Sequence, residues 1–207
     1  MEAMMTLASS VIGRSVWTAS AALLEADTQA RAASLQGVEA LFFYRTDAAE
    51  RLRRQDAAAA RLDQMEVLET LLALPVGIPV PLASLDADQR RAVRALPSGA
   101  ADRDRETVTR RAVRPVRVDL AVVSAAGWRQ GLRDAGRFAP FCRRAMVFTR
   151  RPARLEELLA EADFYGIGVF LAAEHGVEML LHPGEYRPLR HTAAAWCFTE
   201  ELYQLLR

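Results

Sequence analysis

The second half of the 207-residue chain alternates short apolar runs with amphipathic segments, and this alternation is the strongest constraint on its fold. Strands are expected at 116–123, 145–149, 168–172 and 177–182. Helices are expected at 128–142, 155–165 and 192–206. Strands separated by helices indicate a partly parallel sheet, and a tight turn at 174–176 would place a hairpin at one edge. The C-terminal part is therefore predicted to be a mixed sheet flanked by helices, and the fold class to be α/β (α+β).

The N-terminal region, residues 1–44, is predicted to be helical. Apolar side chains recur there at helical spacing, for example at Leu35, Val38 and Leu41. The apolar cluster at 41–44 has two interpretations, which are core packing and a surface for a dimer or another partner. A second aromatic cluster at 196–203 is expected to be core or a dimer seam.

Residues 47–74 are expected to form one long helix or two joined helices. Asp47 is a suitable N-cap, because Glu50 follows three positions later. The run of four alanines at 57–60 favours continuation of the helix. Pro75 must end it.

The order of elements after this helix resembles a winged helix-turn-helix. A short extended segment and a helical turn lead to a basic helix at 87–96, with Asp86 as its N-cap, and a β-hairpin is expected at 107–123. The resemblance implies that helix 87–96 is the recognition helix and that the hairpin is the wing.

We expect three consecutive parts: a helical N-terminal region (1–61), a winged-helix-like segment (62–114) and an α/β domain (115–207). Apolar residues make up 51% of the chain, which is enough for a substantial core. No stretch approaches the length of a membrane-spanning helix, so no membrane association is expected.

Positive charge is concentrated in the middle of the chain. Residues 86–154 contain 17 arginines and 7 acidic residues, whereas the rest of the chain contains 10 arginines and 19 acidic residues. This asymmetry suggests an anionic partner, for which we predict double-stranded DNA. The expected phosphate or base contacts are Arg90, Arg91, Arg94, Arg110, Arg111, Arg129 and Arg133. The alternative is an ordinary solvated basic surface that forms salt bridges to the acidic flanks.

The order of segments over roughly 107–185 resembles the restriction-endonuclease-like superfamily, the PD-(D/E)XK nucleases. The strands and helices that carry this resemblance read VDLAVVS, WRQGLRDAGRFAPFC, RRAMVFT, LEELLAEADFYG and IGVFLAA. In that family the first strand carries an acid, a spacer and a lysine, and its carboxylates hold Mg²⁺.

The nuclease motif itself is missing from this chain. The matching positions are Ala121, Val122 and Val123, Asp119 is the only acid on the strand, and the chain contains no lysine. The resemblance therefore implies an inactive relative that is used for binding or assembly, and an enzyme is not expected.

Two other groups of residues are candidates for redox chemistry or metal binding. Cys142 and Cys197 lie far apart in apolar surroundings, and we expect two buried free thiols, as in a reducing cytoplasm. His182 and Glu185, with His175, are candidate metal ligands, and the alternative is a polar loop with its caps. We expect no cofactor, no metal and a cytoplasmic location.

These observations together predict a non-catalytic DNA-binding or DNA-associated protein with a role in regulation or in defence against foreign DNA. The alternative is a protein-interaction module or homodimeric scaffold, with the clusters at 41–44 and 196–203 at its seam. A third hypothesis is a hydrolase that uses His182 and Glu185.

Overall fold

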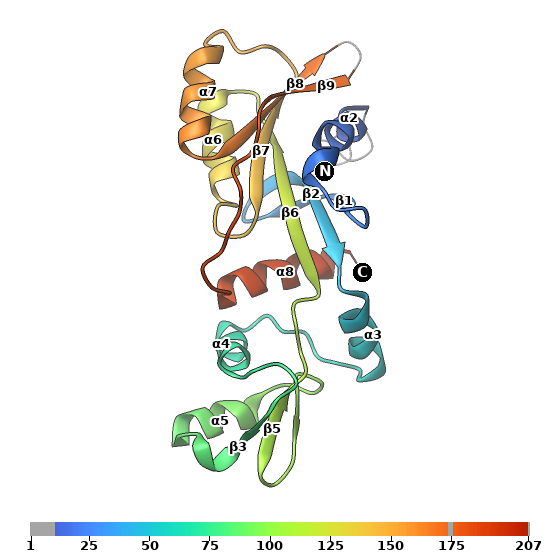
Figure 1. Cartoon of the computed structure of the whole chain (residues 1–207), viewed down its shortest axis with the longest axis vertical. Coiled ribbons are helices and arrows are strands. Elements are labelled where there is room, and N and C mark those ends of the chain that lie inside the picture. Colours follow the sequence, from blue (N-terminus) through green and yellow to red (C-terminus); the bar gives the residue numbers. More distant parts are fainter. Residues whose placement is uncertain (1–10, 174–175, 207) are drawn as a thin grey trace. The chain divides into compact units, whose positions relative to one another are not determined.

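A computed structural model describes residues 11–173 and 176–206, which divide into two compact units (Figure 1). Unit 1 comprises Met1–Arg45 and Val118–Pro188, and unit 2 comprises Thr46–Arg117 and Leu189–Arg207. The units divide the chain after Arg45, Arg117 and Pro188, whereas boundaries were expected at 61/62 and 114/115. None of the helices in the described ranges is long and apolar enough to span a membrane.

A six-stranded mixed sheet with the order β1-β2-β6-β7-β8-β9 forms the centre of unit 1. Its strands are β1 (Gln29–Leu35), β2 (Val38–Thr46), β6 (Val116–Ser124), β7 (Arg143–Phe148), β8 (Ile167–Ala173) and β9 (Gly176–Leu181). The pairs β6/β7 and β7/β8 are parallel, and β1/β2 and β8/β9 are antiparallel. The predicted mixed sheet flanked by helices is confirmed, although the turn expected at 174–176 lies mostly outside the described residues.

Helices cover both faces of this sheet. These helices are α2 (Val11–Ser20), α6 (Trp128–Gly136) and α7 (Leu155–Phe164), and Figure 1 shows α6 and α7 together on one side and α2 on the other. Val16 of α2 packs in one core cluster with Leu120 and Val122, which point to the same face of β6. On the opposite face the rings of Phe42 and Phe138 meet edge to face at 5.3 Å.

The N-terminal region is not wholly helical, and the prediction for residues 29–44 was wrong. These residues form a β-hairpin, which Gln36 and Gly37 close with φ angles of 54° and 70°. Strand β2 is almost continuously buried, so its apolar residues do not alternate with polar ones. A strand buried on both faces produces an apolar run that periodicity alone cannot distinguish from a buried helix.

Residues 47–74 form two separate helices, α3 (Ala48–Asp56) and α4 (Met65–Ala73). The Asp47 N-cap is confirmed, because its side chain accepts from the Glu50 N–H at 2.8 Å. The alanines at 57–60 lie outside both helices, and Ala58 has a φ of 43°. Helix propensity is weak enough for tertiary contacts to override it here.

Unit 2 contains a second sheet, with three antiparallel strands in the order β3-β5-β4. Its remaining elements are β3 (Pro79–Pro81), the 3-10 helix η2 (Leu82–Ser84), α5 (Ala87–Ala95), β4 (Ala101–Arg103), β5 (Thr107–Arg110) and α8 (Ala193–Leu205). Leu68, Leu71, Val93, Val108 and Trp196 are buried together in one core cluster.

The hairpin of unit 2 lies at 101–110 and not at 107–123 as predicted. Strands β4 and β5 pair with each other, whereas β6 joins the six-stranded sheet. The inner residues of β6 are nearly inaccessible, with Leu120 and Val122 both 0% exposed. A strand with this composition needs cover on both faces, which an exposed wing does not provide.

Two glycines on α6 provide a test of this packing. A Cβ on Gly131 would lie 2.7 Å from the Ala125 Cβ and 3.0 Å from the Met146 Sδ, whereas a Cβ on Gly136 meets no atom within 4 Å. We expect Gly131→Ala to lower the free energy of unfolding by about 1–3 kcal/mol through overpacking. Gly136→Ala is the matched control, and it should be neutral or stabilising by up to about 1 kcal/mol. Urea unfolding of both variants measures this, and equal effects would contradict the described position of α6.

Candidate nucleic-acid interface

Helix α5 holds three of the predicted site residues, and a capping box stabilises the start of this helix. The Asp86 side chain accepts from the Gln89 N–H at 2.8 Å, and the Gln89 side chain accepts from the Asp86 N–H at 2.9 Å. Val93 is buried in the core of unit 2, so Arg91 and Arg94 project to the exposed side. This capping box confirms Asp86 as the N-cap.

The three arginines of α5 have different surroundings. Arg90 is half-buried and donates to the Leu85 carbonyl at 2.5 Å. Arg91 makes an exposed ion pair with Asp88 at 3.3 Å. An exposed pair of this kind contributes little stability, so Arg91 remains able to exchange Asp88 for a phosphate. Arg94 is exposed.

The β4–β5 hairpin is tied directly to α5. Arg103 donates to the carbonyls of Val93 and Arg94 at 2.9 and 2.6 Å, and these belong to the last turn of α5. The Val93 carbonyl also accepts from the Leu96 N–H at the end of the helix, and the hydrogen bonds from Arg103 join the hairpin to the last turn of α5. Arg105 is exposed in the loop of this hairpin.

Asp104 shapes the hairpin loop. Its carboxylate accepts from the Glu106 N–H at 2.8 Å, from the Thr107 N–H at 2.7 Å and from the Thr107 hydroxyl at 2.8 Å. These hydrogen bonds lower the pKa of Asp104, because they favour its charged form. Arg103 and Arg105 are not among the predicted site residues, because the sequence predicts a polar loop at 100–106. The Asp104-to-Thr107 turn was the signal available for finding them.

Arg110 does not lie on the surface, so its predicted contact with a phosphate is not compatible with this structure. Its side chain is buried and donates to the carbonyls of Ala112 at 2.9 Å, Leu71 at 2.8 Å and Leu74 at 3.2 Å. Its guanidinium also lies 4.7 Å from the centre of the Trp196 ring. Burial lowers the pKa of Arg110. The sequence shows that Arg110 is charged, but it does not show that its side chain donates to carbonyls at the end of α4.

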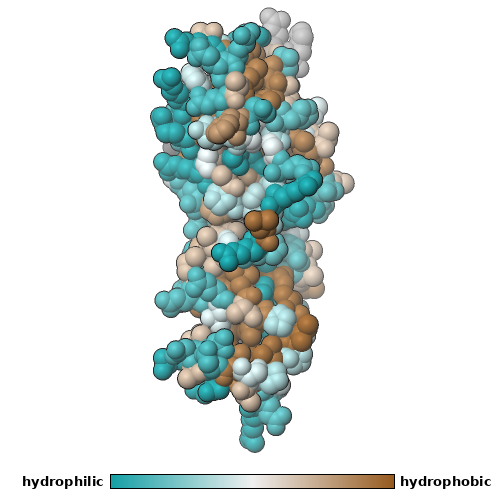
Figure 2. All heavy atoms as spheres, turned by 60° about the vertical axis from the view of Figure 1, so that its left-hand side comes forward, coloured by the Kyte–Doolittle hydropathy of each residue, from teal (hydrophilic) through white to brown (hydrophobic). Residues whose placement is uncertain are grey.

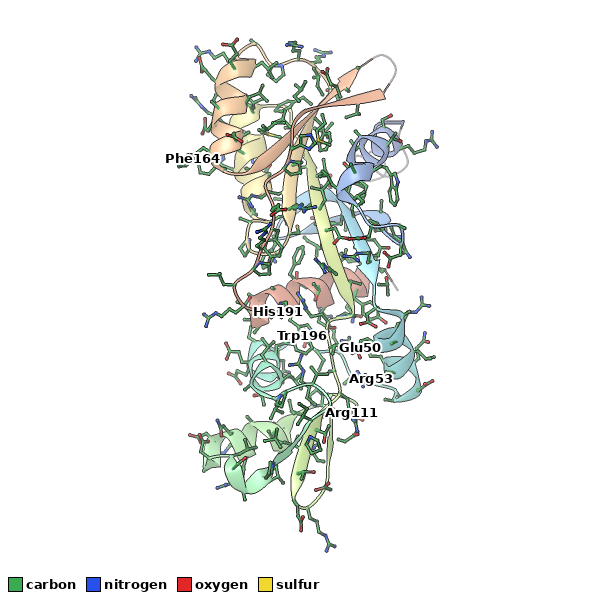
Figure 3. All side chains as sticks on the ribbon, in the orientation of Figure 1. Glu50, Arg53, Arg111, Phe164, His191 and Trp196 are labelled. Carbon is green, nitrogen blue, oxygen red and sulfur yellow. The ribbon has the colours of Figure 1, made fainter. Side chains whose placement is uncertain are left out.

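The other predicted arginines are distributed over both units. Arg111 forms a 2.6 Å ion pair with Asp102, and both side chains are exposed (Figure 3). Arg129 and Arg133 lie on α6 in unit 1. Arg129 stacks on Trp128 at 5.0 Å, and Arg133 donates to the Gln130 side chain at 2.5 Å. Unit 2 therefore gathers Arg91, Arg94, Arg105 and Arg111 as exposed basic residues around α5 and its hairpin.

The strand that resembles a nuclease strand presents no reactive group. Ala121, Val122 and Val123 are at most 1% exposed. Both Asp119 oxygens accept from Arg45, at 2.9 and 3.0 Å, and Asp119 is only 10% exposed. This hydrogen bonding raises the pKa of Arg45. The acid that remains on the strand is therefore neutralised by an arginine.

The candidate metal ligands are not gathered into a site. His182 is exposed, and Glu185 pairs with Arg187 at 2.5 Å. Within the described ranges, no three His, Cys, Asp or Glu side chains are placed to hold one metal ion. His175 lies outside the described residues. Cys142 and Cys197 are free thiols, the first buried and the second partly buried, and burial raises the pKa of both.

A buried ionic cluster lies within unit 2. Arg54 donates to Glu50 at 2.7 Å, to Glu200 at 2.8 and 2.6 Å, and to the Val113 carbonyl at 3.1 Å. The Trp196 indole donates to Glu200 at 2.9 Å. Figure 3 shows Glu50 and Trp196 in the interior of this unit.

Comparison with protein-family models, curated proteins and solved structures finds no match to this chain.

The buried cluster predicts a large effect from one substitution. Arg54→Ala leaves Glu50 and Glu200 buried without their common partner, and we expect a loss of about 3–5 kcal/mol in the free energy of unfolding. Arg51→Ala removes an exposed arginine from the same helix and should change stability by less than about 0.5 kcal/mol. Denaturant titration of both variants tests this, and a mild Arg54 effect would contradict the cluster.

We expect low pH to lower the free energy of unfolding of unit 2, because Glu50 then becomes protonated. Burial acts to raise the pKa of Glu50, but hydrogen bonds from Arg53 and Arg54 outweigh it and hold this pKa below the ordinary 4.5. The resulting stability is complete above pH 4.5 and is lost as the pH falls through the lower folded-state pKa. Glu50→Gln should flatten the acid limb of unfolding free energy against pH, and exposed Glu69→Gln should leave it steep.

Proposed function

We propose that unit 2 binds double-stranded DNA, without catalysis, through α5 and the β4–β5 hairpin. The observation that carries this proposal is the order of elements, in which α4, β3, η2 and α5 are followed by two strands that complete a sheet of order β3-β5-β4. This order resembles that of a winged helix, in which a helix would enter a groove and a hairpin would reach the neighbouring backbone. The anchoring of the hairpin to α5 by Arg103 supports their acting as one surface.

The charges of α5 favour one orientation on DNA. Asp86 and Asp88 lie at its N-terminal end and would be repelled by phosphates, whereas Arg94 lies in its last turn. Arg91 and Arg94 follow those acids along α5 and are exposed, as is Arg105 in the hairpin loop. We infer that DNA is contacted by the C-terminal half of α5 together with the hairpin loop. Phosphate contacts then dominate affinity, and binding weakens as salt is raised.

We infer that unit 1 does not carry out the carboxylate- and Mg²⁺-dependent hydrolysis of the nuclease family. Asp119 is neutralised by Arg45, and the neighbouring positions on β6 are buried apolar residues. Unit 1 is therefore proposed as a non-catalytic partner domain.

Binding to a labelled random duplex across a salt series tests the proposal. Replacing Arg91, Arg94 and Arg105 together by alanine should weaken binding and reduce the slope of log affinity against log salt by up to about 2.7. The control replaces Arg51, Arg187 and Arg190, which are exposed and give the same change in net charge. The control should keep the wild-type slope. Equal losses in the two triple variants, or no binding by the wild type at low salt, would overturn the proposal.

The interaction-module alternative would need an apolar seam other than the clusters at 41–44 and 196–203. Residues 41–44 are at most 6% exposed, and Trp196, Phe198 and Tyr203 are likewise buried, so the core interpretation is confirmed. A different observation keeps a protein partner as a second candidate. Figure 2 shows apolar residues at the surface of the lower part, and Val76 and Ile78 of unit 2 are 51% and 58% exposed. Sedimentation of Val76→Ser with Ile78→Ser would reveal loss of a self-associated state.

A further inference from the structure

Unit 1 contains a hollow of about 400 Å³ beside α6. It is lined by Arg129, Leu132, Arg133, Gly136, Ala139, Arg144, Glu161, Tyr165 and Ile167. The four lining residues of α6 follow the spacing i, i+3, i+4, i+7, so one face of that helix forms a wall. The volume lies within the range of pockets that bind small molecules.

The lining of this hollow carries an excess of positive charge. Arg129, Arg133 and Arg144 face one acid, Glu161, so the formal charge is 3 − 1 = +2. Within the described ranges, none of the three arginines forms an ion pair with a carboxylate. Clustered arginines without acidic partners repel one another, and a bound dianion would remove that repulsion.

Of the three arginines, Arg144 is the one with an unsatisfied buried hydrogen-bond donor. It stands at the start of β7, is half-buried, and donates through one terminal nitrogen to the Tyr165 carbonyl. Its Nε is buried and has no hydrogen-bond partner. Burial lowers the pKa of Arg144, because a half-buried guanidinium is less well solvated than one in water. Buried charged groups are retained when a partner compensates the loss of water.

The remainder of the lining suits a planar apolar group. Leu132 and Ile167 are at most 7% exposed, and Tyr165 is 49% exposed at the end of α7. Next to it Phe164 is 82% exposed and points away from the unit in Figure 3, with its ring 5.1 Å from that of Tyr165. Exposed aromatic rings next to arginines are suited to stacking on nucleic-acid bases.

We propose that this hollow binds a 5′-nucleotide, with its phosphate held by Arg129, Arg133 and Arg144 and its base against Tyr165. The nucleotide is either free in solution or the 5′-phosphorylated end of a strand, since both present the same groups. The proposal does not rest on DNA binding by unit 2, because every residue of the hollow belongs to unit 1.

Isothermal titration calorimetry of the full chain tests the proposal, with a nucleoside 5′-monophosphate, the same nucleoside without phosphate, and inorganic phosphate as ligands. We expect saturable 1:1 binding of the monophosphate and at least about tenfold weaker binding of the other two. A single-stranded tetranucleotide, with and without a 5′-phosphate, then identifies the source. Tighter binding of the phosphorylated strand than of the mononucleotide assigns the site to strand ends, and the reverse assigns it to free nucleotides.

The variants separate a specific site from general attraction. Gly136→Leu adds a side chain to the lining of the hollow and removes no charge. A Cβ at that position meets no atom within 4 Å, so the substitution is not expected to overpack the fold. It should weaken the monophosphate about tenfold or more, as should Arg144→Gln. Arg150→Gln with Arg151→Gln removes exposed arginines that do not line the hollow, and it should have no effect. Absence of binding, equal binding of inorganic phosphate, or equal losses in test and control variants would each overturn the proposal. Unchanged urea midpoints establish that the variants are folded.

Discussion

The buried ion pair between Arg54 and Glu200 is the interaction on which unit 2 depends. Its members stand 146 positions apart, so it joins the start of the unit to the helix that returns at the end of the chain. Desolvating two charges is costly, and such a pair is tolerated only when its remaining polar atoms are satisfied. Here Glu50, the Val113 carbonyl and the Trp196 indole satisfy them. Helix α8 thereby presents Trp196 to the core in which α4 and α5 pack.

Arginine serves two opposite purposes in this lysine-free chain. Arg110, from a buried position, and Arg103, from an exposed one, donate to the carbonyls at the ends of α4 and α5. Others, such as Arg94 and Arg105, remain exposed. The guanidinium group is suited to the first purpose because it donates several hydrogen bonds in fixed directions and retains its charge. A count of basic residues therefore overstates the charge that reaches a partner.

Local patterns in the sequence were sufficient for part of the fold. The caps at Asp47 and Asp86 and the alternation from β6 to β8 depend on neighbouring residues, and they were predicted. The β1–β2 hairpin was not, because β2 is buried on both faces and lacks a strand period. The return of α8 to unit 2 and the burial of Arg110 depend on contacts between distant segments, which have no local signature. Arg103 and Arg105 differ from these cases, because the Asp104-to-Thr107 turn beside them is local and has a recognisable sequence pattern.

Hydrogen–deuterium exchange of the full chain, with and without a short duplex, would locate the DNA-binding surface. We expect DNA to slow exchange of amide hydrogens in the second half of α5 and in the hairpin loop at 104–106, while α3 and α8 exchange as before. Protection confined to unit 1, or equal protection of α3 and α5, would contradict the assignment of the interface to α5 and its hairpin.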